Sequence, residues 1–365
     1  MWRSDKFFWG AASSAHQVEG GNTNDFSAGG FDAGRACDHY NLFEKDFDIA
    51  QSLSHNAHRF SLEWSRIEPE EGSFSEEALR HYEKVIAALK NRGLEPFVTL
   101  WHFTSPIWLS KKGGWANPRA VDSFGRYVRV VVARFKDSVK FWIPLNEPEV
   151  YAVLCYLRGK WPPRRCNPLA ALAVLNNLRE AHRTAYGIIK DLQSSAEVGI
   201  AENLVGGSAL SRWVFNFFNR GTLQRIKNKL DFIGLNYYMK VSLNPLNPLR
   251  KNIKTGDLDW EIYPEGIYQN LKYLARFQKP VFVTENGVAD AADRLRADFI
   301  KDHVRWANKA KDEGVDLRGY FYWSLLDNFE WHHGFGPRFG LVEVNYDTME
   351  RKVRPSASEY SRLIK

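Results

Sequence analysis

Two glutamates in the chain have neighbours that suit acid–base or nucleophilic chemistry. Glu147 follows an asparagine and precedes a proline, and Glu285 lies in the run Thr-Glu-Asn-Gly. Hydrolysis of a glycosidic bond needs such a pair, because one carboxylic acid protonates the leaving oxygen while one carboxylate attacks or activates water. Either glutamate alone could instead cap a helix or form a salt bridge. The two together favour the catalytic interpretation.

The elements that must position these glutamates are eight short runs rich in Val, Ile, Phe and Tyr, which predict buried strands. They lie at Phe7–Gly10, Ala57–Leu62, Leu94–Leu100, Val139–Leu145, Val198–Ala201, Phe232–Asn236, Val281–Thr284 and Leu317–Trp323. Helical patterns separate them at Ser75–Arg92, Pro118–Phe135, Pro168–Leu192 and Arg294–Glu313. Strands that alternate with helices indicate a parallel sheet.

Eight strand–helix units favour closure of that sheet into a barrel. The fold class that we expect is α/β, a single (β/α)8 TIM barrel with shortened loops. Such a barrel, of about 250 residues before loop insertions, fits a chain of 365 residues. No internal repeat, low-complexity tract or linker divides the sequence, so residues 1–365 are expected to form one catalytic domain. An open, doubly wound sheet is the alternative.

Polar and aromatic side chains follow the predicted strands, at the end of the barrel where the active sites of this fold lie. They are Gln17, Glu19, His102, Asn146, Glu147, Asn236, Tyr238, Glu285, Trp323, Asp327, Glu330 and Trp331. Asn236 and Tyr238 are two positions apart, so a strand points both side chains to one side. Hydrogen-bonding groups combined with flat aromatic faces suit a sugar pocket, and the 13 tryptophans of the chain fit that interpretation.

Charge and composition exclude several other classes of protein. The net charge of +7 comes without a long basic run, which argues against nucleic acid as a partner. Cys37, Cys155 and Cys166 lack metal-type spacing, and His332 and His333 lack a third ligand, so we expect no metal and no cofactor. No apolar run of 18 residues predicts a membrane helix, and the N-terminus does not resemble a signal peptide. A cytoplasmic location is therefore expected, and the oligomeric state stays open.

Five motifs in the same order along the chain resemble those of the family 1 glycoside hydrolases, the β-glucosidase and β-galactosidase family. They are the opening segment Phe7–Gly20, the strand-three segment Trp101–Pro106, the Asn-Glu-Pro at 146–148, the Val-Thr-Glu-Asn-Gly at 283–287 and the segment Tyr322–Trp331. Each motif alone is weak evidence. All five at predicted strand ends make the resemblance specific over nearly the whole chain.

The resemblance implies a mechanism that retains the anomeric configuration. Glu147 would be the acid/base and Glu285 the nucleophile. Arg59 and Tyr238 would contact the nucleophile and keep it ionised. A structural salt bridge is the other interpretation of Arg59.

The resemblance also implies which residues bind the nonreducing sugar, a terminal β-D-glycosyl residue. Asn146 would hold the 2-hydroxyl, and Trp323 would form the floor of the subsite, although a tryptophan there could also belong to the barrel core. The full predicted set of substrate-binding residues is Gln17, His102, Asn146, Asn236, Tyr238, Trp323, Glu330 and Trp331.

The chain is shorter than most members of the family, and we place the missing residues mainly between Asn203 and Asp231. Loops in that region usually form a wall on the aglycone side, so this side is expected to be more open. Trp115 and Trp260 are predicted as stacking faces at its rim.

Other departures concern substrate preference. Glu63 stands where many relatives carry a small polar residue, and Phe103 stands where many carry Trp. A catalytically silent carbohydrate-binding barrel is one alternative function, but such a protein would be expected to lose one carboxylate. A 6-phospho-β-glycosidase is another, but those relatives usually lack Glu330 and Trp331, and an anionic Glu330 would repel a phosphate. Glucose, galactose and fucose remain open as the preferred sugar.

Overall fold

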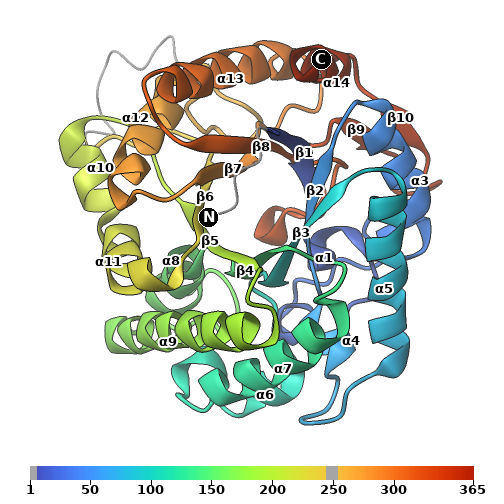
Figure 1. Ribbon diagram of the computed structural model, residues 1–365, viewed down its shortest axis with the longest axis vertical. Helices are drawn as coiled ribbons and strands as arrows, with labels where there is room; N and C mark the ends of the chain where they lie inside the picture. Colours follow the sequence, from blue (N-terminus) through green and yellow to red (C-terminus); the bar gives the residue numbers. More distant parts are fainter. Residues whose placement is uncertain (1–5, 244–253) are drawn as a thin grey trace.

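The computed structural model describes residues 6–243 and 254–365. Its eight main strands form one closed barrel in which every strand is parallel to its neighbours (Figure 1). They are β1 Phe8–Ala12, β2 Ala57–Ser61, β3 Glu95–Trp101, β4 Phe141–Leu145, β5 Glu197–Asn203, β6 Phe232–Tyr237, β7 Val281–Asn286 and β8 Leu317–Trp323. Pairing of β1 with β8 closes the barrel. The predicted TIM barrel is thus confirmed, and the open-sheet alternative is wrong.

Helices surround the barrel (Figure 1). The four predicted helices correspond to α5 Glu76–Asn91, α7 Ala120–Phe135, α9 Pro168–Leu192 and α13 Arg296–Asp312. The remaining α-helices are α1 Ala15–Val18, α2 Asp25–Ala28, α3 His39–Ser52, α4 Trp64–Ile67, α6 Ile107–Lys111, α8 Pro148–Tyr151, α10 Ala209–Phe215, α11 Phe217–Ile226, α12 Glu265–Leu274 and α14 Pro355–Ile364.

Shorter elements complete the described chain. They are the 3-10 helices η1 Gly114–Ala116, η3 Lys227–Lys229, η5 Ala275–Phe277 and η6 Trp331–His333, the π-helix η2 Ala152–Leu157, and the antiparallel pair β9 Val342–Val344 and β10 Arg351–Val353. Over residues 6–243 and 254–365, no helix has both the length and the apolar character needed to cross a membrane.

A layer of phenylalanines fills the inside of the barrel. One ring comes from each of six strands, mostly from the first half of the strand, and the rings are Phe8, Phe97, Phe141, Phe232, Phe282 and Phe321. Phe97 and Phe141 stack with centroids 4.2 Å apart. Because small barrels are filled by interior side chains, this apolar layer closes the interior and leaves the other end of the strands for polar groups.

Candidate active site

A cavity of about 480 Å³ lies at the carboxyl ends of the barrel strands. Most of the predicted site residues line it, namely Gln17, His102, Asn146, Glu147, Tyr238, Glu285, Trp323, Glu330 and Trp331. The two others, Arg59 and Asn236, are fully buried and donate hydrogen bonds to residues of this set. The structure therefore brings together all the residues that the resemblance assigns to the site. Glu19 and Asp327, the other polar residues expected after strands, instead form ion pairs with Arg66 and Arg354.

A larger depression of about 830 Å³ lies where the barrel strands begin. Charged side chains of both signs line it, among them Lys190 and Asp231, which form an ion pair of 2.8 Å. We assign no chemistry to it, because its lining includes none of the predicted site residues.

Glu285 is buried at the end of β7, with 3% of its surface exposed. The Nη1 of Arg59 donates to its Oε1 at 2.5 Å, and the hydroxyl of Tyr238 donates to its Oε2 at 2.5 Å. Burial raises the pKa of Glu285 above its usual value, and Arg59 and the Tyr238 hydroxyl offset part of this rise. Since burial keeps the pKa of Tyr238 well above its usual value, that hydroxyl stays protonated and continues to donate. Both carboxylate oxygens thus have a donor that favours the charged form.

Glu147 occupies a different environment, directly after the strand-end residue Asn146. Its backbone adopts a left-handed conformation with φ of 45°, a strained conformation that is common at functional sites. Its amide donates to the carbonyl of Ala201 at 2.8 Å, and its Oε1 accepts from Asn236 at 2.7 Å and from Asn203 at 2.9 Å. Burial and the charge of Glu285 raise the pKa of Glu147 to about 8.

The two carboxyl groups therefore lie in environments that favour different protonation states. Glu147 has only neutral amide partners and a negative neighbour, so it keeps its proton below about pH 8. Glu285 has a guanidinium and a phenol, which favour the carboxylate. Paired titratable groups whose environments separate their pKa values are typical of an acid and a nucleophile that work together.

Asn146 is oriented by three neighbours. Its side-chain oxygen accepts from Arg59 at 2.6 Å and from Asn236 at 3.1 Å, and its nitrogen lies 3.2 Å from the Nε2 of His102. Burial lowers the pKa of His102 well below its usual value, so the imidazole is neutral. Its Nδ1 has no hydrogen-bond partner within the described chain, although it is buried. A ligand hydroxyl in the cavity would satisfy it.

Flat rings line the same part of the cavity. The imidazole of His102 lies nearly parallel to Trp323 at 6.0 Å and to Trp331 at 6.1 Å between centroids. Trp323 is buried, yet it also contacts the cavity. These rings offer apolar faces of the kind that stack on the C–H surface of a sugar.

Glu330 and Gln17 form the polar edge beside these rings. The amide nitrogen of Gln17 donates to the Oε2 of Glu330 at 3.3 Å. Burial, and then the charges of Glu285 and Glu147, raise the pKa of Glu330 to about 8. This carboxyl is thus able to donate a hydrogen bond as well as accept one.

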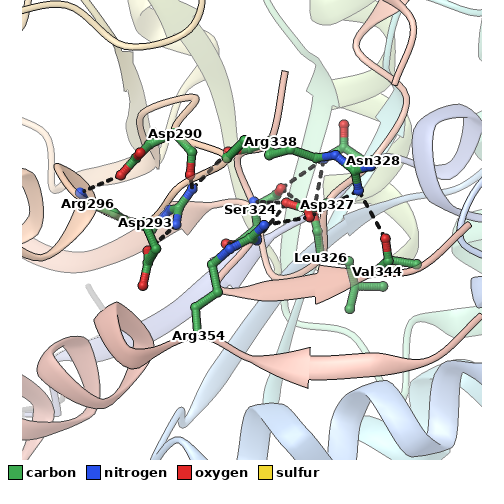
Figure 2. Close-up of polar contacts among 12 residues, drawn as sticks. Asp290, Asp293, Arg296, Ser324, Leu326, Asp327, Asn328, Arg338, Val344 and Arg354 are labelled. Carbon is green, nitrogen blue, oxygen red and sulfur yellow. Dashed lines mark hydrogen bonds and ion pairs between the residues drawn. The ribbon is translucent and has the colours of Figure 1, made fainter. Parts of the chain in front are cut away.

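A buried ion-pair network holds the loop after β8, which carries Glu330 (Figure 2). Asp327 accepts from both Nη atoms of Arg354, at 2.8 and 2.9 Å, and from Arg338 at 3.3 Å. In the same loop, Asn328 donates to the hydroxyl of Ser324 at 2.8 Å. We infer that the position of Glu330 depends on the ion pairs of Asp327 with Arg338 and Arg354, which lie outside the cavity.

Two further polar residues belong to the site although the sequence did not indicate them. Asn203, which contacts Glu147, is the last residue of β5, two positions beyond the predicted end of that strand. Thr284 donates to the side-chain oxygen of Asn236 at 2.7 Å and so turns the amide nitrogen of Asn236 toward Glu147. A rule that examined every strand end would have found Asn203.

Trp115 is a wrong prediction. It is completely buried, lies 5.3 Å from Trp101 between ring centroids, and belongs to the core outside the barrel rather than to a rim. Trp260, by contrast, lines the cavity beside Tyr238 at 5.6 Å.

Among the two departures from the family pattern, only Phe103 lines the cavity. Glu63 lies buried elsewhere, where its carboxylate accepts from the hydroxyls of Ser65 and Thr104. In the described part of the chain no three His, Cys, Asp or Glu side chains are grouped as metal ligands. His332 instead accepts a hydrogen bond from the indole of Trp161 at 3.0 Å.

Comparison with known proteins agrees with this geometry. The model of glycosyl hydrolase family 1 matches residues 2–212 and 210–365. β-Glucosidase A of Thermotoga maritima is 35% identical over 98% of this chain and 97% of its own length, and a β-galactosidase of Pyrococcus woesei is 30% identical over 99% and 96%.

Solved structures give the same result. A β-glycosidase from Pyrococcus horikoshii superimposes with a TM-score of 0.90 at 37% identity, covering 99% of this chain and 94% of that one. The Thermotoga maritima β-glucosidase in complex with glucoimidazole has a TM-score of 0.92 at 33% identity, covering 99% and 98%. The protein is a glycoside hydrolase. The chain belongs to glycosyl hydrolase family 1.

The alignment with the Thermotoga maritima enzyme spans 435 positions, more than the 365 residues of this chain, so that relative carries insertions. Where they fall is not tested, and the region between Asn203 and Asp231 stays our prediction. In the structure this region forms the short helices α10 and α11 and the 3-10 helix η3.

Proposed function

We propose that the protein hydrolyses terminal β-D-glycosides with retention of configuration. The observation that carries the proposal is the contrast between its two carboxyl groups. Glu285 is held by Arg59 and Tyr238, while Glu147 has a pKa of about 8. The similar proteins named as β-glucosidases and β-galactosidases support the same activity.

In the proposed reaction, Glu285 attacks the anomeric carbon while Glu147 donates its proton to the leaving glycosidic oxygen. The bond to the aglycone breaks and a covalent glycosyl-enzyme forms. Glu147, now a carboxylate, takes a proton from water, which displaces Glu285 and releases the sugar. Both carboxyl groups return to their starting states, so the cycle needs no cofactor.

We propose that the polar end of the cavity binds the nonreducing sugar. Asn146 would hold the 2-hydroxyl, because Arg59 and His102 fix its amide in one orientation. Gln17, His102, Glu330 and Trp331 would bind the hydroxyls at C3, C4 and C6, and Trp323 would form the floor. Asn236 would act through Glu147 and Asn146, to which it donates.

NMR of the first-formed product tests the mechanism. We expect the β anomer of the sugar to appear first, since two displacements at one carbon restore its configuration. Initial release of the α anomer would show that Glu285 is not the nucleophile. Hydrolysis of aryl β-glucosides but not of their 6-phosphates is also expected, because Glu330, one of the residues proposed to bind the hydroxyls at C3, C4 and C6, brings no positive charge to balance a phosphate. No hydrolysis of any aryl β-glycoside would favour a silent sugar-binding barrel.

Two sequence-based expectations stay predictions. One is that residues 1–365 form a single catalytic domain, and the other is the cytoplasmic location. A comparison of kcat/KM for the aryl β-glycosides of glucose, galactose and fucose would identify the preferred sugar.

A further inference from the structure

Exposed large apolar side chains are concentrated in one stretch of the described sequence. Of the large apolar residues that are exposed, nine lie between positions 157 and 243, and the two others are Val353 and Leu363. The nine are Leu157, Leu169, Leu172, Leu210, Trp213, Val214, Phe215, Phe217 and Leu243. Such a concentration marks a binding surface more often than it occurs without function.

The helix α10 is unusual within this group. Its consecutive residues Trp213, Val214 and Phe215 are 54%, 41% and 47% exposed, so apolar side chains reach solvent on several sides of one helical turn. Large apolar side chains of a helix normally face the core, whereas in α10 the buried residue is Ser211. We call Leu210, Trp213, Val214, Phe215 and Phe217 the α10–α11 surface.

The α10–α11 surface continues into the active-site cavity. Phe215 and Phe218 line the cavity themselves. Phe217 contacts Phe218 at 5.6 Å and Trp213 at 6.0 Å between ring centroids, both edge to face. A chain of aromatic rings therefore runs from the cavity wall to the outer surface.

Apolar residues also line the cavity on this side. They come from α8, η2 and the segments after β5 and β6, and they are Val150, Val153, Leu154, Val205, Met239 and Val241. Figure 1 shows α8, α10 and α11 on the same side of the barrel. Leu157 and Leu243 follow these wall residues in the sequence, and both side chains are exposed. Polar side chains also line the cavity here, among them Arg158, Asn216 and Asn219, but those of Asn216 and Asn219 already hydrogen-bond to Val205 and Glu149.

We propose that the α10–α11 surface binds the hydrocarbon chain of amphiphilic β-glycosides, whose sugar occupies the polar end of the cavity. The proposal rests on the proposed function and adds the class of aglycone. A short aryl aglycone would be contained within the cavity, whereas a long alkyl chain is able to reach Trp213 and Phe217. A membrane surface would explain exposed aromatic residues, but it would not explain their continuity with the cavity wall.

A series of alkyl β-glucosides from hexyl to dodecyl, each below its critical micelle concentration, tests the proposal. We expect kcat/KM to rise about twofold for each added methylene. Complete removal of one methylene from water would raise kcat/KM about fourfold. The expected rise is smaller because an alkyl chain that lies on a surface loses only part of its hydration. The slope of log kcat/KM against the number of methylenes measures this rise. In the double variant Trp213→Ser/Phe217→Ser the slope should fall to less than half of the wild-type value.

The matched control is Val353→Ser/Leu363→Ser, which removes the two exposed apolar side chains that lie elsewhere. This control should keep the wild-type slope. Leu210→Ser, a smaller change on the α10–α11 surface, replaces the double variant if that variant is unstable, and it should also reduce the slope.

Hydrolysis of 4-nitrophenyl β-glucoside by the wild-type protein separates the two proposals. Without that activity the proposed function fails. With it, a wild-type kcat/KM that is constant from hexyl to dodecyl overturns the alkyl-chain proposal alone, as do equal slopes in the two double variants. Cosedimentation with phosphatidylcholine vesicles together with a constant kcat/KM would assign the surface to a membrane instead.

Discussion

The two ends of the active-site cavity are built in different ways. At the sugar end, polar groups come from barrel strands and are buried, as Asn146 and Glu285 are, and their hydrogen bonds fix them in one geometry. At the outer end, short helices present apolar side chains such as Trp213 and Phe215 to solvent. The first arrangement suits a reaction that needs positioned charges, and the second suits a ligand recognised by its apolar area.

The difference has an energetic basis. Buried polar groups need partners in defined directions, so a changed hydroxyl in the sugar leaves an unsatisfied donor or acceptor. The free energy gained by apolar contact is roughly proportional to the buried area and does not depend on direction. Selectivity should therefore be sharp for the sugar and graded for the aglycone.

The largest expected effect separates the two carboxyl groups. Glu285→Gly should reduce kcat/KM by at least about 10,000-fold for every aglycone, because no glycosyl-enzyme forms. Glu147→Ala should cost about 100- to 10,000-fold on alkyl β-glucosides, but less than about tenfold in the first step with dinitrophenyl β-glucoside, whose leaving group needs no proton. Stopped-flow release of dinitrophenol measures that step. Equal losses on both substrates would show that Glu147 is not the acid.

The second prediction concerns the support of the sugar end. Asp327→Asn should lower the free energy of unfolding by about 3–5 kcal/mol, because it leaves the buried guanidinium of Arg354 without its carboxylate. Urea unfolding followed by tryptophan fluorescence measures the change. Asp302→Asn, which breaks an exposed ion pair with Arg305, is the matched control and should be close to wild type. A similar stability for both variants would mean that the network in Figure 2 does not hold the loop.

The barrel fold could be predicted from the sequence because its strands are buried on both faces. Val281–Asn286 and Phe141–Leu145 are uninterrupted buried segments, and such runs stand out between helical patterns. The predicted end of β5 was too early, because Glu202 and Asn203 are polar residues inside a strand. Asn203 was missed because no residue after this strand was considered, although it lies as far beyond the predicted end as Tyr238 does beyond Asn236.

Other features depend on packing between distant segments. Trp115 and Trp260 look alike in sequence, yet one lies in the core beside Trp101 and the other lines the cavity. The pairing of Asp327 with Arg354 joins a loop to the residue before α14, and no local pattern predicts it. The α10–α11 surface was not predicted either, because the exposure of Trp213 and Phe217 depends on how α10 and α11 pack, which no local pattern shows.

The smallest expected effect concerns Asn203, which we regard as a positioning residue. Its amide stabilises the carboxylate form of Glu147, so Asn203→Ala should raise the pKa of Glu147 above its value of about 8. Glu147 acts as an acid in its protonated form, which is present below this pKa and lost above it. The basic limb of kcat/KM should therefore move to higher pH, by about half a unit to one unit.

The measurement is kcat/KM for 4-nitrophenyl β-glucoside between pH 5 and pH 10. The acidic limb should stay in place, because the donors to Glu285 are Arg59 and Tyr238, neither of which this variant alters. Asn177→Ala is the matched control, since Asn177 donates to a core carbonyl away from the cavity, and its profile should follow wild type. If kcat/KM is lower at every pH and the basic limb does not move, Asn203 has only a structural role. A shift of the basic limb to lower pH would contradict the assignment of Glu147 as the acid.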